Sequence, residues 1–125
     1  MSHFTTIKTQ IRDLDALHDA CSELGLILLQ NAEARGYSTQ KTRGDYVIQL
    51  KGPYDIALNR QANGSYGLTA DHWEGAVEGE VGQGFGKLLQ LYGVHKATRE
   101  ARRKGHFVNR SQKQDGTIKL VINGL

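Results

Sequence analysis

The sequence predicts an α+β fold in which a single antiparallel β-sheet carries two α-helices packed on one face. Three observations lead to it: two well-separated helical patterns, hairpin turns at Asn63-Gly64 and Asp115-Gly116, and no repeated β-α-β rhythm. Asn-Gly and Asp-Gly favour the two-residue turns that join antiparallel strands. Such sheets commonly leave one face for helices to cover. At 125 residues, we expect one domain that spans residues 1–125.

The chain is expected to begin with a strand, a helix and a second, short strand. His3–Ile11 alternates and is rich in threonine and isoleucine, which is typical of a strand. Asp13 or Asp15 then caps a helix that Gly25 ends. The apolar run Leu26–Gln30 predicts the short strand.

For the middle and the end of the chain, the sequence predicts mainly antiparallel hairpins. Residues 31–44 are polar, and we expect a loop there or a short strand around residues 36–38. The acidic stretch at residues 71–80 reads as turns. Alternating or β-branched runs predict the remaining strands at residues 45–50, 55–60, 66–70, 107–112 and 117–123.

The longest predicted helix spans Glu80–Lys104 and ends at Gly105. Its apolar residues recur on one broad face, as in a helix that lies on a core. The predicted helical contribution to the core is Leu14, Leu17, Cys21, Leu88, Leu89 and Tyr92. Cys21 lies on the apolar stripe of the first helix, where a buried structural thiol is expected rather than a nucleophile.

Basic residues gather at the end of the long helix and just beyond it. Between Lys96 and Lys113, seven cations face Glu100 alone, a local surplus of six charges. The helix dipole explains only the cations in the last turn. The predicted interaction surface consists of Lys96, Arg99, Arg102, Arg103, Lys104 and Arg110.

Two functions fit this predicted surface, and a solvated helix end remains the alternative to both. The first is a non-enzymatic binding or adaptor module that contacts an acidic protein partner. The second is an RNA- or DNA-binding protein that uses the second helix. Aromatic residues are sparse in this region, where only Phe107 is nearby, which disfavours a stacking platform for single strands.

The other chemically capable residues are weaker candidates. Asp71, His72 and Glu74 are metal-capable types, but near-consecutive loop residues seldom converge on one ion. The glycine-rich stretch at residues 82–86 lacks the hydroxyl residue and parallel context of a phosphate loop. His95 has no partner in nearby sequence and reads as a core histidine bonded to backbone or to a tyrosine. We therefore expect no catalytic residues, no cofactor, no metal and no small-molecule ligand.

Composition restricts the class of protein further. Charged residues make up 23% of the chain, and the net charge of +3 with a pI near 9.1 permits contact with anionic surfaces without requiring it. Cys21 is the sole cysteine, so no internal disulfide forms, and a reducing compartment is expected. No secretory signal or membrane-spanning run is evident. These features predict a cytoplasmic protein without membrane contact.

Several short motifs are spread over nearly the full length of the chain: Met1–Phe4, Ile7–Ile11, Arg35–Tyr37, Tyr54–Ile56, Asn63–Tyr66, Gln90, Tyr92, His95, Asp115–Ile118 and Leu120-Val121. Together they resemble an uncharacterised family, the hypothetical chloroplast open reading frame thirty-five type. Its members occur in algal plastids, cyanobacteria and some of their viruses. The resemblance implies plastid stroma as a second location and supplies no activity or catalytic residue. This chain departs from the family pattern in its glycine-rich residues 74–86 and its more basic residues 96–104.

Overall fold

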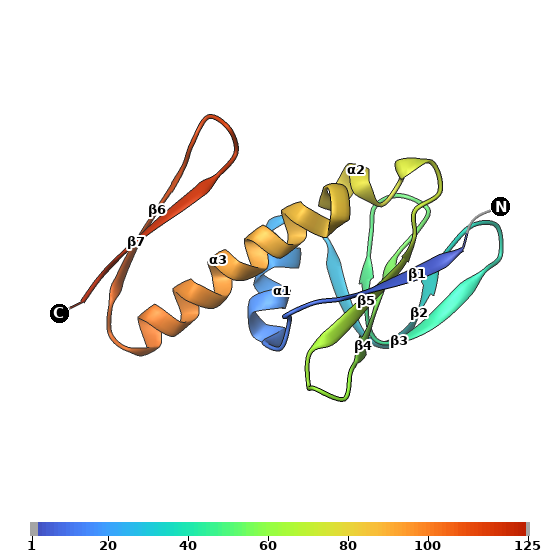
Figure 1. Cartoon of the computed structure of the whole chain (residues 1–125), viewed down its shortest axis with the longest axis horizontal. Helices are drawn as coiled ribbons and strands as arrows, with labels where there is room; N and C mark the ends of the chain where they lie inside the picture. Colours follow the sequence, from blue (N-terminus) through green and yellow to red (C-terminus); the bar gives the residue numbers. More distant parts are fainter. Residues whose placement is uncertain (1–2, 125) are drawn as a thin grey trace.

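The computed structural model describes residues 3–124 as an α+β fold with a five-stranded antiparallel sheet, a separate two-stranded hairpin and two long helices (Figure 1). The strand order of the large sheet is β1-β5-β4-β3-β2. Short 3-10 turns lie at Trp73–Gly75 and Gln83–Phe85. The elements are β1 (Phe4–Lys8), α1 (Leu14–Glu23), β2 (Ile27–Arg35), β3 (Lys41–Gln49), β4 (Ile56–Arg60), β5 (Tyr66–Asp71), α2 (Glu78–Val81), α3 (Gly86–Arg103), β6 (Phe107–Gln112) and β7 (Ile118–Asn123).

The prediction of a single sheet is wrong, because β6 and β7 pair only with each other in the described chain. The length of α3 gives the physical reason. Its 18 residues carry the chain about 27 Å along the helix axis before β6 begins. The last hairpin therefore begins at the far end of α3, away from the large sheet, and turns back beside the helix (Figure 1), where Gln90 Nε2 donates to the carbonyl of Gly116.

Helix α1 begins as the sequence predicts. The side chain of Asp13 accepts a hydrogen bond from the backbone N–H of Ala16, which is the interaction of an N-cap. Asp15 lies in the first turn, where a carboxylate is favoured by the helix dipole. Gly25 follows the helix with φ of +73°, as expected for a glycine that ends a helix.

Strands β2 and β3 extend through the polar stretch at residues 31–44, so a loop over that whole stretch is wrong, and so is the alternative of a short strand around residues 36–38. Only residues 36–40 turn, and Gly36 N–H donates to the carbonyl of Gln40 across that turn. The polar residues are compatible with strands because most of them are exposed. The hairpins at Asn63-Gly64 and Asp115-Gly116 are confirmed.

Helix α3 starts at Gly86, six residues later than predicted. The preceding backbone cannot be helical, because Gly82, Gly84 and Phe85 all have positive φ. A Cβ at Gly82 would lie 2.8 Å from the backbone nitrogen of Lys87, so the chain needs glycine there. The short α2 and a sharp turn thus occupy the predicted first part of the helix.

The main core joins both long helices to the large sheet. Leu17 and Cys21 of α1 and Leu88 and Tyr92 of α3 are buried, as predicted. Leu14 and Leu89, predicted for the same core, are half-buried and pack against its edge. The sheet contributes Ile48, Ile56, Leu58, Leu68 and Ala70 to this cluster. That both helices cover one face of the sheet stays a prediction.

Candidate interaction surface at the end of α3

Two of the six predicted surface residues form ion pairs with α1, and Arg99 is the first. Its Nε donates to Asp19 Oδ2 at 2.5 Å, and its Nη2 donates to Asp19 Oδ1 at 3.0 Å. The hydrogen bond from Arg99 lowers the pKa of the Asp19 carboxyl. Arg99 therefore fixes α3 against α1 and is not a free cation.

Arg110 is the second, and its partner is Glu23 near the end of α1. Arg110 donates from Nη1 to Glu23 Oε1 at 2.9 Å and from Nη2 to Oε2 at 2.7 Å. His95 Nε2 lies 2.8 Å from the same Oε1, so the predicted backbone or tyrosine partner for His95 is wrong. Hydrogen bonding by Arg110, with a smaller part from His95, lowers the pKa of Glu23 to about 2. Glu23 of α1 therefore contacts side chains of both α3 and β6.

The remaining cations have no ion pair with any residue in the 3–124 range that the structure describes. Lys96 is half-buried, whereas Arg102, Arg103 and Lys104 are exposed. We call these three consecutive residues the basic tip of α3. The structure thus divides the predicted surface into residues that hold the fold together and residues available to an external partner.

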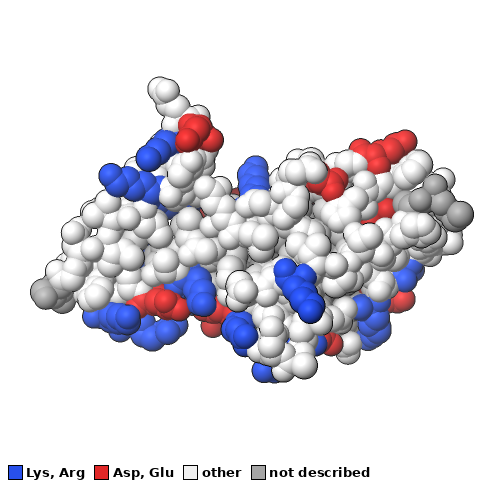
Figure 2. Space-filling model, in the orientation of Figure 1, with Lys and Arg blue, Asp and Glu red and all other residues white. Residues whose placement is uncertain are grey.

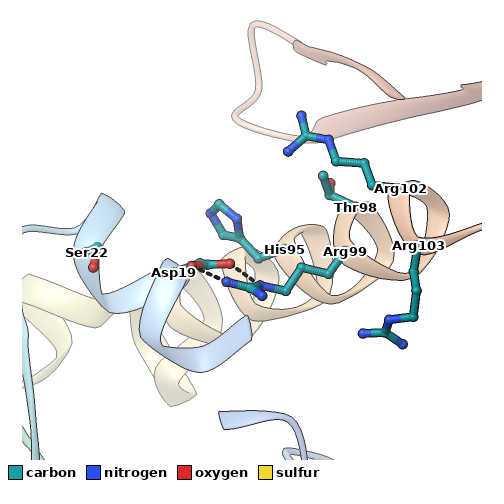
Figure 3. Close-up of a pocket in the computed structure, with 7 residues that line it drawn as sticks. All are labelled: Asp19, Ser22, His95, Thr98, Arg99, Arg102 and Arg103. Atoms are coloured by element: carbon teal, nitrogen blue, oxygen red, sulfur yellow. Dashed lines mark hydrogen bonds and ion pairs between the residues drawn. The ribbon is translucent and has the colours of Figure 1, made fainter. Parts of the chain in front are cut away.

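An open groove of about 760 Å³ lies beside the basic tip, between α1 and α3. Arg102 and Arg103 both border it, but in Figure 3 their guanidinium groups point to opposite sides of α3. Consecutive residues on a helix are about 100° apart, so this divergence follows from the helix geometry. The two groups are therefore poorly placed to hold one small anion together. The groove lining is Asp19, Ser22, His95, Thr98, Arg99, Arg102 and Arg103.

Charge on the face seen in Figure 2 is mixed. Lysines and arginines are interspersed with acidic residues rather than gathered into one field. Near the end of α3, the nearby carboxylates include Asp19 and Glu100. The cations of this region that lack an ion pair within the described residues are therefore few, and Arg102 and Arg103 lie in the last turn of α3.

The metal-capable residues of the acidic stretch do not converge. Asp71 is fully buried and accepts hydrogen bonds from the backbone N–H groups of Tyr37 and Trp73. His72 pairs with Glu78 rather than with Asp71 or Glu74. Within residues 3–124, no three His, Cys, Asp or Glu side chains form a group that could hold a metal ion.

Sequence reasoning missed an ion pair between exposed Arg35 and buried Asp55 at the turn of the β2–β3 hairpin. Arg35 donates from Nε and Nη2 to the two Asp55 carboxylate oxygens, each at 2.8 Å. Asp55 is 2% exposed and also accepts from the backbone N–H groups of Arg35 and Leu50. The signal was present, because Arg35 and Asp55 lie in two of the quoted motifs. Those motifs meet in space and hold the hairpin, which gives them a structural role.

Comparison with known proteins identifies the family. The family model described as "Protein of unknown function (DUF1257)" matches residues 20–121 of the chain. The chain belongs to this family. Its relatives include "Uncharacterized protein ycf35" of Guillardia theta, with 34% identity over 125 residues, and the protein of the same description in Pyropia yezoensis, with 32% over 126. Each alignment covers 98% of this chain and 96% of the relative.

These relatives match the resemblance predicted from the motifs, and their descriptions assign no activity. No solved structure gives a significant match. Among the described helices, none is long and apolar enough to cross a membrane.

Proposed function

We propose that this DUF1257 domain is a non-enzymatic binding module that contacts an acidic protein partner through the basic tip of α3. One observation carries the proposal: Arg102, Arg103 and Lys104 are exposed without an ion pair in residues 3–124, whereas Arg99 and Arg110 are paired. Arg102 and Arg103 lie in the last turn of α3, where the helix dipole favours cations, and their charges are left to solvent. A carboxylate-rich partner neutralises these charges and associates faster because of them.

The divergence of Arg102 and Arg103 favours a macromolecular partner over a small anion. A small anion would need several donors directed at one point, as in bidentate recognition of phosphate. Here the two guanidinium groups lie on opposite sides of the helix (Figure 3). A partner that follows the end of α3 meets both, because its carboxylates are spread over a surface.

Nucleic acid is the alternative partner, favoured by the same three cations. Phosphate contacts by lysine and arginine release counterions, so such binding weakens steeply with salt and is lost after nuclease treatment. An acidic protein ranks first because the tip offers no series of aromatic side chains for base stacking; Phe107 is the only aromatic nearby. A catalytic function ranks third. For either binding function, the proposed location is the cytoplasm or the plastid stroma.

A pull-down with and without nuclease separates the two partners. The bait is the intact chain, and the test variant carries Arg102→Glu, Arg103→Glu and Lys104→Glu. The matched control carries Lys8→Glu, Lys41→Glu and Lys51→Glu, which makes the same charge change at exposed lysines of the sheet region. The proposal expects one protein that survives nuclease, is retained by the control and is lost from the tip variant.

Two results would count against the proposal. Loss of all captured material after nuclease favours the nucleic-acid function. Equal capture by the tip variant and the parent, with unchanged circular dichroism for both, leaves the basic tip as a solvated helix end.

A further inference from the structure

The β6–β7 hairpin exposes several large apolar side chains. Phe107 is 64% exposed, the largest value among the large apolar side chains of the described chain, and Val121 and Ile122 are 41% and 45% exposed. The hairpin begins beyond the end of α3 that lies away from the large sheet and runs back beside that helix (Figure 1), where Gln90 Nε2 donates to the carbonyl of Gly116. Neighbouring apolar side chains exposed on one face of such an element form a patch of the kind that another chain covers.

The strand register separates the two faces of this hairpin. Arg110 pairs across the strands with Leu120, and Gln112 with Ile118. Arg110 is bonded to Glu23 of α1, and Ile118 packs against the main core, so their face is directed at the body of the protein. Ile122, on the same face near the end of β7, extends past the body and is 45% exposed. Directly opposed residues share a face and the faces alternate along each strand. The other face, called here the outer hairpin face, consists of Phe107, Asn109, Ser111, Lys119, Val121 and Asn123.

The outer hairpin face combines apolar and basic side chains. Phe107 and Val121 are diagonal neighbours, since Phe107 opposes Asn123 and Asn109 opposes Val121. Lys119 stands on the same face, two residues before Val121, and is exposed. Phe107 also follows Lys104 of the basic tip by only three residues, so the apolar face begins where the tip ends.

We propose that the outer hairpin face docks an acidic protein segment that carries exposed apolar side chains. This inference rests on the proposed function, because it names the chemistry of the same acidic partner. Its apolar side chains pack on Phe107 and Val121, and its carboxylates face Lys119 and the basic tip. In residues 100–124, six cations (residues 102–104, 110, 113 and 119) stand against Glu100 and Asp115, and one of the six, Arg110, is already paired with Glu23 of α1.

Two other occupants, a second copy of the chain and a nucleic acid, fit this face less well. A second copy of the chain would bring the same cations to the interface, and like charges placed opposite one another oppose association. A nucleic acid would find a single ring for base stacking on this face, that of Phe107, and would gain little from Val121, which has none. An acidic segment with apolar side chains matches both the apolar and the basic side chains of the face.

The test measures binding of two short fluorescent peptides by anisotropy at low salt. In one peptide glutamates alternate with leucines; in the other, glutamates alternate with serines. The parent protein is expected to bind the leucine peptide at least about 10-fold more tightly, the effect of burying one large apolar side chain. Phe107→Ser with Val121→Ser should reduce binding of the leucine peptide to the level of the serine peptide and leave the latter unchanged.

Two further variants show whether a change in peptide affinity is specific to the outer hairpin face. Ile27→Ser with Leu29→Ser removes two exposed apolar side chains from β2, at the edge of the large sheet, and should change neither affinity. The tip variant with three glutamates should weaken both peptides, because both carry the same negative charge. Phe107 and Val121 are well exposed, so their replacement should leave the melting temperature of the domain nearly unchanged.

Failure of this inference is distinct from failure of the proposed function. If the hairpin variant keeps tight binding of the leucine peptide while the tip variant loses it, the docking face is wrong and the basic tip stands. If the tip variant binds both peptides as tightly as the parent does, the proposed function fails as well. A parent dimer in sedimentation that the hairpin variant makes monomeric overturns the inference in favour of a second copy of the chain.

Discussion

Arg110 of β6 donates two hydrogen bonds to Glu23 of α1, at 2.9 and 2.7 Å, although 87 residues separate them in the chain. The same carboxylate lies 2.8 Å from His95 Nε2 of α3. Glu23 is therefore the residue through which the last hairpin is tied to both long helices. Its replacement tests how firmly the hairpin is held.

Glu23→Gln is expected to loosen the hairpin without unfolding the domain. The Glu23 and Arg110 side chains are 34% and 36% exposed, and ion pairs this exposed contribute less than about 1 kcal/mol. The free energy of unfolding should fall by no more than that, while amide exchange across residues 107–123 accelerates. Glu33→Gln, at an exposed position on β2, is the control and should leave exchange in the hairpin unchanged. Equal exchange in both variants would show that Glu23 does not hold the hairpin.

The same pair predicts a loss of stability in acid. The ordinary glutamate pKa of 4.5 falls to about 2 for Glu23 in the folded protein, mainly through hydrogen bonding by Arg110. A carboxyl whose pKa is depressed by folding stabilises the fold fully above its unfolded pKa. That contribution is lost as pH falls from about 4.5 towards 2. Unfolding titrations of the parent should show a steeper decline over this window than those of Glu23→Gln, and parallel curves would contradict the prediction.

Local patterns predicted much of the fold. Asp13 caps α1, and the Asn63-Gly64 and Asp115-Gly116 turns lie where their residue types placed them, because caps and tight turns depend on a few neighbouring residues. The start of α3 was missed because apolar periodicity continues through residues whose backbone is not helical. Phe85, for example, fits the apolar stripe and is buried, yet its φ is +61°.

The candidate surface was predicted less completely, for a different reason. A count of charges along the chain cannot reveal that Asp19 and Glu23 approach Arg99 and Arg110 from another helix. Nor could it show that β6 and β7 form their own sheet and expose Phe107. The two ion pairs join residues 80 and 87 positions apart, for which one sequence carries no local signal.

Leu88 and Leu89 provide a test of the core at adjacent positions of α3. Leu88 is fully buried, whereas Leu89 is half-buried at the edge of the core. Leu88→Ala should lower the free energy of unfolding by about 2–5 kcal/mol, because it removes buried apolar surface and leaves a cavity. Leu89→Ala should lower the free energy of unfolding by clearly less. Chemical denaturation of both variants measures the difference, and equal costs would contradict the assigned orientation of the helix.

Gly82 and Gly93 should respond to alanine in opposite directions. Gly82 has φ of 84° and ψ of 164°, a region that essentially only glycine occupies. An added Cβ there would also lie 2.8 Å from the backbone nitrogen of Lys87. Gly82→Ala should therefore destabilise the domain by about 1–3 kcal/mol and disturb the start of α3.

Gly93 lies within α3, and a Cβ at that position meets nothing within 4 Å. Gly93→Ala should stabilise the domain by about 0.5–1 kcal/mol, because alanine loses less backbone freedom than glycine when it enters a helix. Thermal unfolding of the two variants gives the comparison, with the parent as reference. If Gly82→Ala melts at or above the parent temperature, the turn before α3 does not have the described conformation. If Gly93→Ala melts below the parent, that side of α3 is covered rather than open.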